Sequence, residues 1–159
     1  MRSYVLACGW HFATLVGLTA ILLAAPVGAE EQPAALGSAT KQPLPAHRVA
    51  AIYFHRTQRC PTCRRIGGYI EEAIKTGFPG QVKDGSVAVY MVDYENPRNA
   101  KYTKSYKVSR PTLVLADIHN NKVVAWKPMP KVWSLVYKKD DFFKYVHDGV
   151  KDYFKEKKQ

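Results

Sequence analysis

Cysteine and acidic residues are both scarce in this 159-residue chain. Its three cysteines are too few for a small domain held together by several disulfides, and one fewer than a four-thiolate zinc site needs. Asp and Glu number 13 against 24 Lys and Arg, so the formal net charge is +11, which favours an anionic partner or surface without naming one. Hydrophobic residues make up 47% and charged residues 23% of the chain, which excludes a disordered or collagen-like protein. The length fits one globular domain.

The first 29 residues have the organisation of a secretory signal peptide. A short basic start, Met1-Arg2, precedes an apolar run over residues 12–25, and Val27-Gly28-Ala29 offers a small-residue cleavage site. An uncleaved N-terminal anchor is the alternative, because the run is nearly long enough to span a bilayer. We therefore predict an exported, periplasmic or otherwise extracytoplasmic protein, which is either released by cleavage or held at the membrane by this segment.

Cleavage after residue 29 would leave two cysteines, Cys60 and Cys63, in an oxidising compartment. Residues 30–47 follow, with three prolines, many small residues and no apolar periodicity, and this composition predicts a flexible linker. The folded domain is therefore expected over residues 48–159, and we expect it to be a monomer.

Apolar patterning over that domain predicts alternating strands and helices. Strands are expected over residues 49–54, 86–92, 112–116 and 122–126, with a hairpin turn at 119–121. Strands linked by a helix should be parallel, whereas the closing hairpin is antiparallel. The predicted fold class is therefore α/β, a mixed four-stranded sheet sandwiched between helices.

Three helices are expected between and after these strands. The first follows Cys63, the second starts at Asn96 and ends near Tyr106, and the third is capped by Asp140 or Asp141. The third helix should bury the face formed by Phe143, Val146, Val150 and the pair Tyr153/Phe154. Residues 77–85 are expected to form a loop.

The chemistry lies in Cys60-Pro61-Thr62-Cys63, between the first strand and the first helix. Pro61 suits the first helical position, so Cys60 is expected at the N-cap with its sulfur facing the free amide of Cys63. A helix N-terminus favours negative charge, so the pKa of Cys60 should fall below its ordinary value of about 8.5. Cys60 is then the nucleophile, and Cys63 resolves the mixed disulfide formed there. This chemistry needs a redox-active Cys60–Cys63 disulfide and no bound cofactor.

The surroundings of this motif allow other interpretations. Arg59 and Arg64 flank it and should stabilise the Cys60 thiolate, or they form an ordinary solvated helix face. No zinc site is predicted, because the chain has no second cysteine pair. The main alternative function is binding of a soft metal or metalloid such as Cu(I) or As(III) by the dithiol.

A strand, a CxxC at the following helix start and a later Pro-Thr before a strand together resemble the thioredoxin fold over residues 49–117. The resemblance implies a cis peptide bond at Pro111, which would face the dithiol and dock substrate together with Arg110 and Thr112. Over about residues 50–155 the chain is also similar to small exported thioredoxin-like proteins called ArsF-type nitrophenyl-compound nitroreductase subunits.

These resemblances imply a thiol–disulfide oxidoreductase whose partners are protein thiols or disulfides, or a separate reductase that it serves in electron transfer. The first strand is apolar throughout, so the buried acid of thioredoxins has no counterpart, and Arg59 stands where a tryptophan flanks the first cysteine. A more basic site is therefore expected. The basic residues are scattered along the chain, so no nucleic-acid binding is predicted.

Overall fold

The structure, a computed structural model, describes residues 43–155. The predicted signal segment and most of the predicted linker lie outside these residues. Within the described range, no helix combines the length and the apolar character that crossing a bilayer requires.

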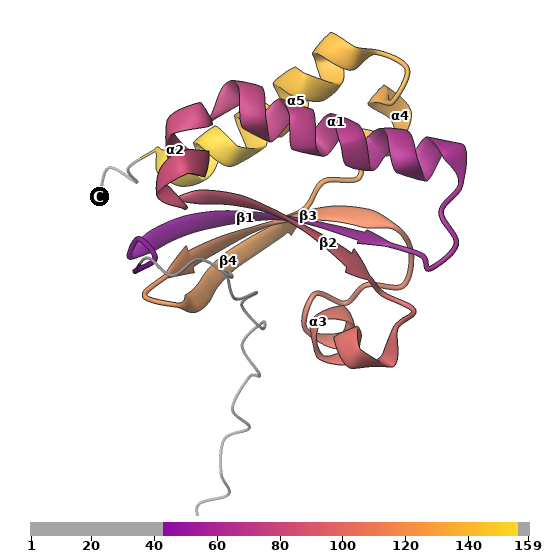
Figure 1. Cartoon of the computed structure of the whole chain (residues 1–159), viewed down its shortest axis with the longest axis horizontal. Coiled ribbons are helices and arrows are strands. Elements are labelled where there is room, and N and C mark those ends of the chain that lie inside the picture. The colour runs from indigo at the N-terminus through magenta and orange to yellow at the C-terminus, as the bar shows by residue number, and fades with distance from the viewer. Residues whose placement is uncertain (1–42, 156–159) are drawn as a thin grey trace, which may run out of the picture. The chain divides into compact units, whose positions relative to one another are not determined.

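Strands and helices alternate along the described chain (Figure 1). The strands are β1 (His47–His55), β2 (Val87–Asp93), β3 (Thr112–His119) and β4 (Lys122–Pro128). The helices are α1 (Pro61–Gly77), α2 (Pro79–Asp84), α3 (Ala100–Ser105), α4 (Val132–Leu135) and α5 (Lys139–Phe154), with a 3-10 turn, η1 (Pro97–Asn99), before α3.

The four strands form one mixed sheet in the order β2-β1-β3-β4. β1 pairs with β2 in parallel across the α1 connection, and β3 runs antiparallel to both β1 and β4. This order, with a helical crossover followed by a closing hairpin, is the arrangement of the thioredoxin fold. The predicted fold class is confirmed.

The two faces of the sheet bury alternate residues of β1. Val49, Ala51 and Tyr53 face the core that α1 and α5 cover, whereas Ala50, Ile52 and Phe54 face the side of α3. Figure 1 shows α1, α2, α4 and α5 on one side of the sheet and α3 on the other. The continuous apolar run of β1 therefore follows from burial on both faces.

The two glycines inside α1 have different surroundings. A Cβ on Gly67 would lie 3.3 Å from Nη2 of Arg59 and 3.7 Å from the ring of Tyr53, whereas a Cβ on Gly68 would meet nothing within 4 Å. Gly67 therefore lets the helix approach its neighbours closely.

The prediction of a loop over residues 77–85 is wrong, because most of this segment forms α2. Pro79 occupies the first turn of that helix, and Gly85 ends it with a left-handed φ of 83°. Phe78, between α1 and α2, is 4% exposed and fixes the junction in the core. A six-residue helix has too little apolar periodicity to be recognised from sequence.

The start of the last helix also differs from the prediction. Lys138 is at the N-cap without a side-chain hydrogen bond, and Asp140 and Asp141 lie inside the first turn. There their charges favour the positive end of the helix without capping it. Phe142 is fully buried and Phe143 only partly, so the buried face is rotated by one residue at this end.

In the middle of the chain, the predicted helix starts where expected but differs in its type of helical structure. Asn96 caps its helix as predicted, accepting a hydrogen bond from the Arg98 amide, but the segment is η1 followed by short α3. The β3–β4 hairpin turns at Asn120 and Asn121, whose φ angles are 49° and 64°. Asparagine tolerates that left-handed conformation, which suits a two-residue hairpin turn.

Candidate active site

The CxxC motif lies where the sequence predicts, at the start of α1. Cys60 is the N-cap, with extended backbone angles, and Pro61 occupies the first turn. The Cys63 amide donates a hydrogen bond to the Cys60 sulfur over 3.2 Å. Cys60 is exposed, whereas Cys63 is 6% exposed. One thiol therefore faces solvent and the other lies in the protein.

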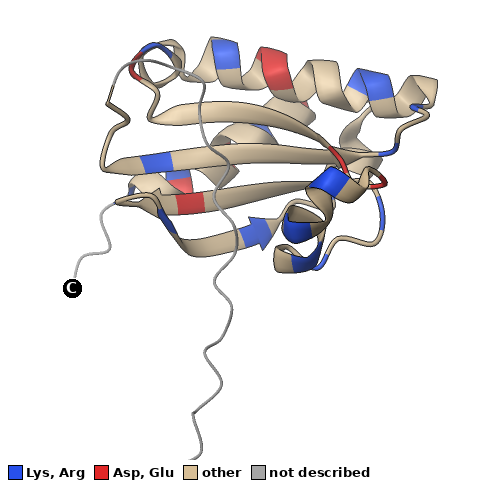
Figure 2. Ribbon diagram, turned by 60° about the horizontal axis from the view of Figure 1, so that its bottom comes forward, with Lys and Arg blue, Asp and Glu red and all other residues tan. Residues whose placement is uncertain are grey.

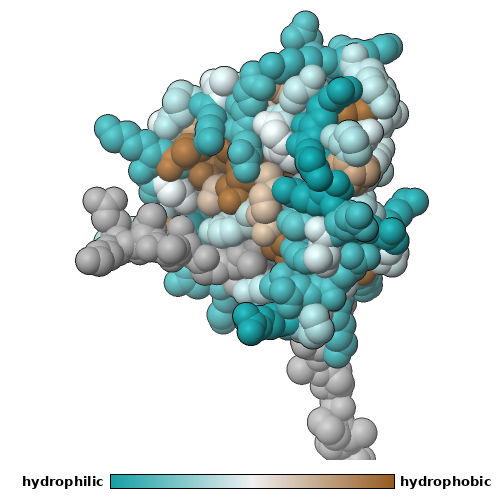
Figure 3. All heavy atoms as spheres, turned by 45° about the vertical axis from the view of Figure 1, so that its right-hand side comes forward, coloured by the Kyte–Doolittle hydropathy of each residue, from teal (hydrophilic) through white to brown (hydrophobic). Residues whose placement is uncertain are grey.

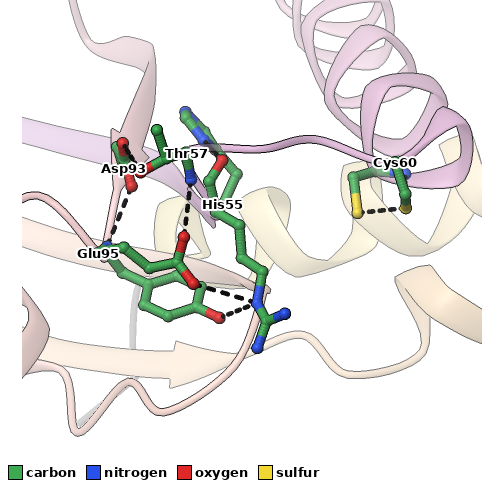
Figure 4. Close-up of polar contacts among 8 residues, drawn as sticks. His55, Thr57, Cys60, Asp93 and Glu95 are labelled. Carbon is green, nitrogen blue, oxygen red and sulfur yellow. Dashed lines mark hydrogen bonds and ion pairs between the residues drawn. The ribbon is translucent and has the colours of Figure 1, made fainter.

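Both cysteines are free thiols, and their sulfur atoms lie 2.6 Å apart (Figure 4). The hydrogen bonds that Cys60 receives, first from the Cys63 thiol and then from the Cys63 amide, lower the pKa of Cys60. Burial, followed by the hydrogen bond to Cys60, raises the pKa of Cys63. The negative charge of a singly ionised pair therefore resides on the exposed sulfur.

The loop between β1 and the dithiol is held to the end of β2. The Thr57 hydroxyl donates to Asp93 over 2.7 Å, and the Thr57 amide donates to Glu95 over 3.1 Å. Arg56 pairs with Glu95 over 3.3 Å and donates to the Tyr94 hydroxyl over 3.0 Å. Figure 4 shows this network beside the dithiol. It fixes the loop that delivers Cys60 to the helix start.

Arg59 does not extend freely into solvent. Its guanidinium lies 6.0 Å from the Tyr53 ring centroid, and Nη2 donates to the Met91 sulfur over 3.6 Å. Its Nε atom is buried without a hydrogen-bond partner in the described part of the chain. The charge of Arg59 is thus held over β1 and β2.

Two of the other nearby arginines have partners of their own. Arg56 is engaged by Glu95, as described above, and the Arg65 guanidinium lies 5.6 Å from the Tyr137 ring centroid. Arg64 is exposed on the first turn of α1. The hydrogen bonds at the helix start come first among the causes of the low Cys60 pKa. An effect of Arg59 and Arg64 on that pKa stays a prediction.

Tyr53 is a site residue that the sequence did not reveal. Its side chain is fully buried, and its hydroxyl has no hydrogen-bond partner among residues 43–155. Burial raises the pKa of Tyr53 well above its ordinary value, and the nearby Cys63 raises it further. A polar hydroxyl therefore lies beside the buried thiol, in a strand that appears purely apolar. In the sequence, the only indication was that neighbouring strand residues alternate between faces, which places Tyr53 on the face opposite to Phe54.

Pro111 lies at the same end of the sheet as the dithiol. Thr112 pairs with Phe54, the last residue but one of β1, so Pro111 lies just beyond that end. Arg110, Pro111 and Thr112 line a hollow of about 270 Å³ together with Pro130 and Trp133. The Trp133 indole donates to the Pro111 carbonyl over 3.1 Å. The three predicted docking residues therefore share one hollow, and the cis bond stays a prediction.

Trp133 is another residue missed from sequence, because its short helix α4 was not predicted. Its side chain is 37% exposed, and Tyr137, just after α4, is 75% exposed. Figure 3 turns forward the end of the sheet where α1 begins and shows a mainly hydrophilic surface broken by apolar patches. The exposed Trp133 ring therefore lies beside Pro111.

Positive charge is spread over the described surface rather than confined to the dithiol. Basic residues occur on α1, on α3 and on β4 (Figure 2). Examples are Lys75, Lys101, Lys104, Lys122 and Lys127.

No protein-family model matches the chain, and no curated protein matches it. Solved structures similar to it include a thioredoxin from Fasciola hepatica, with 22% identity over 62% of this chain and 81% of that chain and a TM-score of 0.37. Thioredoxin O2 from Arabidopsis thaliana, in the oxidized state, shows 22% identity over 60% of this chain and 76% of that chain, with a TM-score of 0.36.

Proposed function

We propose that the protein is a thiol–disulfide oxidoreductase that uses Cys60 and Cys63. The observation that carries this proposal is the pair itself: an exposed sulfur of lowered pKa at a helix N-cap, beside a buried thiol of raised pKa. Thiolates, not thiols, attack disulfides, so the two cysteines suit different steps of one reaction.

In the first step, the Cys60 thiolate attacks a substrate disulfide. A Cys60–substrate bond forms, the substrate S–S bond breaks, and the departing sulfur takes up a proton. In the second step, Cys63 loses its proton and attacks the Cys60 sulfur, which releases the second substrate thiol. The dithiol has then given two electrons to the substrate and become the Cys60–Cys63 disulfide, which an external thiol must reduce again.

Tyr53 supports the second step in this proposal. The raised pKa keeps its phenol protonated, so the hydroxyl can donate a hydrogen bond to Cys63 as that sulfur becomes a thiolate. A buried thiolate without a donor would be costly. Tyr53 thus serves as a positioning residue for the resolving thiol.

Substrate docking is proposed for the hollow around Pro111. Arg110 and Pro111 directly precede β3, Thr112 is its first residue, and Trp133 closes one side of the hollow. An extended segment carrying a disulfide would lie there with its sulfur toward Cys60. Protein disulfides are therefore the proposed substrate class.

For the cellular setting, we propose an exported protein without a bound cofactor, related to the ArsF-type nitroreductase subunits and passing electrons to or from a separate reductase. The signal-like segment at residues 1–29 supports export, and the two-electron dithiol suits a carrier between partners.

The test is turnover of insulin disulfides by the full chain with dithiothreitol as the reductant. The wild-type chain should accelerate insulin reduction well beyond the dithiothreitol background, and the Cys60→Ser/Cys63→Ser double variant should not. Equal rates for the two proteins would overturn the proposal. Elemental analysis of the purified wild-type chain is the second measurement: one equivalent of copper or arsenic that is lost in the double variant would instead support dithiol metal binding.

A further inference from the structure

A second cluster of chemically reactive side chains lies at the opposite end of β1. His47, the first residue of β1, pairs directly with His119, the last residue of β3. Asp117 is two residues before His119, so its side chain lies on the same face of β3. The three side chains therefore meet on the α1 and α5 face, roughly 25 Å along β1 from its dithiol end.

All three donor groups converge on one point. The Nε2 atoms of His47 and His119 lie 2.9 and 3.2 Å from the same Asp117 oxygen, Oδ1. The two imidazole rings stack with their centroids 4.2 Å apart. One ligand atom from each residue lies within 4.8 Å of the others, and this is the one such group of His, Cys, Asp or Glu in the described chain.

The cluster is open to solvent on one side and packed on the other. The side chains of His47, Asp117 and His119 are 33%, 13% and 46% exposed. They line a hollow of about 430 Å³ near the end of α5, where the Phe154 ring lies 5.0 Å from the His47 ring. An ion can therefore reach the cluster from solvent. Contact with Phe154 and the pairing of β1 with β3 limit the movement of the cluster's side chains.

The other charged groups of this hollow are already paired. Asp152 also lines it, but its carboxylate pairs with Lys127 over 3.2 Å and with Lys155 over 2.9 Å. Asp117, in contrast, has the two imidazoles as its ion-pair partners in the described residues. Asp117 is therefore the acidic group of this hollow that no Lys or Arg pairs with in the described residues, and two imidazole nitrogens lie beside it.

We propose that His47, Asp117 and His119 bind a divalent transition-metal ion. Two imidazole nitrogens and one carboxylate oxygen are a donor set that Zn²⁺, Co²⁺, Ni²⁺ and Cu²⁺ accept, whereas Mg²⁺ and Ca²⁺ prefer oxygen alone. Bonds of about 2.0–2.2 Å to one ion place tetrahedral ligand atoms about 3.4 Å apart, so small side-chain rotations would admit it. Three protein ligands leave a coordination position for water.

A metal at this position would join the amino end of β1 to the carboxyl end of β3. Because an ion that binds only the folded chain stabilises it, Zn²⁺ should raise the midpoint of thermal unfolding. The site does not depend on the dithiol chemistry, and it can be tested in a chain without thiols.

The experiment uses the full chain with Cys8→Ser, Cys60→Ser and Cys63→Ser, so that no sulfur can bind the probe. Zn²⁺ binding is measured by isothermal titration calorimetry, and the visible absorption of added Co²⁺ reports its ligand geometry. His119→Ala removes an exposed ligand and Asp117→Asn removes the carboxylate charge with little change of shape. His55→Ala, at the other end of β1, is the matched control.

One equivalent of Zn²⁺ should bind to the thiol-free chain and to its His55→Ala form. Affinity should fall at least roughly ten-fold in His119→Ala and in Asp117→Asn, and the thermal stabilisation by Zn²⁺ should fall with it. Circular dichroism identifies a variant that fails to fold, in which case the other variant decides. Absence of binding, or binding that both folded variants retain, would overturn the proposal and leave the cluster as hydrogen-bonded histidines.

Discussion

The two ends of β1 carry reactive side chains that come together by different routes. At the carboxyl end, Cys60 and Cys63 are neighbours in sequence, and one helical turn aligns them. At the amino end, His47 meets Asp117 and His119 across 70 or more residues through strand register. The first grouping depends on local structure, whereas the second exists only once the sheet has formed.

This difference also separates the chemistry of the two ends. The dithiol is asymmetric, with one exposed and one buried sulfur whose pKa values shift in opposite directions. The His–Asp cluster is nearly symmetric, with two stacked imidazoles on one carboxylate oxygen. Two thiols of different pKa suit a reaction in which they act one after the other, whereas three side chains directed at one point suit the binding of one ion. The two ends should therefore respond independently to substitution.

The largest expected effect is that of Cys60→Ser or Cys63→Ser on insulin turnover, which should fall by more than about 100-fold because each removes one of the two required sulfurs. The two variants should differ in kind: Cys63→Ser should accumulate a mixed disulfide at Cys60, visible as added mass. His119→Ala, at the other end of β1, should leave turnover unchanged. Loss of turnover in His119→Ala would show that the two ends are coupled.

The next effect is the difference in alkylation between the two thiols of the reduced protein. Because the pKa of Cys60 is lowered, more of it is thiolate at any pH below the ordinary cysteine pKa of about 8.5. Its reaction rate with iodoacetamide should therefore reach its plateau at a lower pH than that of a free cysteine. Cys63, buried and of raised pKa, should stay largely unlabelled. Mass mapping after brief labelling measures both, and equal labelling would contradict the asymmetry.

A smaller effect is expected for Tyr53→Phe, which removes one hydroxyl and keeps the ring in the core. Loss of one hydrogen bond to the Cys63 thiolate, about 1 kcal/mol, should slow resolution of the mixed disulfide about five-fold. Tyr106→Phe is the matched control, because Tyr106 is a buried phenol on the opposite face of the sheet. Similar slowing in both variants would assign the effect to packing rather than to the dithiol end.

The smallest effect is that of replacing Arg59 and Arg64 by alanine. Arg64 is exposed, so salt and solvent screen its charge, and the Arg59 guanidinium contacts Tyr53 and Met91. The Cys60 pKa should rise by less than about one unit. The pH profile of Cys60 alkylation measures this change. Lys75→Ala with Lys83→Ala, remote from the dithiol, is the control. An equal rise in that control would mean that net charge acts rather than position.

The sequence predicted the parts of the fold that local patterns determine. The apolar run at residues 49–54, the cysteine and proline at the start of α1 and the asparagines of the β3–β4 turn each act within a few residues. The dithiol and its N-cap hydrogen bond followed from the same local rules. Short helices such as α2 and α4 were missed, because four to six residues carry too little periodicity.

The missed parts of the site depend on tertiary contacts. Tyr53 looks like one more apolar strand residue until α1 places Cys63 above it. Trp133 hydrogen-bonds to Pro111, 22 positions earlier in the chain, from the short helix α4, which no sequence pattern predicted. His47, Asp117 and His119 become neighbours through the pairing of β1 with β3. Sequence patterns can identify candidate residues, but tertiary contacts such as the register of β1 and β3 determine which of them lie together in a site.

The central claim is that Cys60 and Cys63 form one reversible two-electron couple, and a redox titration tests it most directly. The full chain carrying Cys8→Ser is equilibrated in dithiothreitol buffers of graded oxidation state, quenched with acid and mapped by mass spectrometry. The account predicts a single transition in which Cys60 and Cys63 lose two protons together and form a disulfide with each other, absent when either is serine. Two thiols that stay reduced throughout, or that oxidise only to mixed disulfides with the buffer, would contradict it.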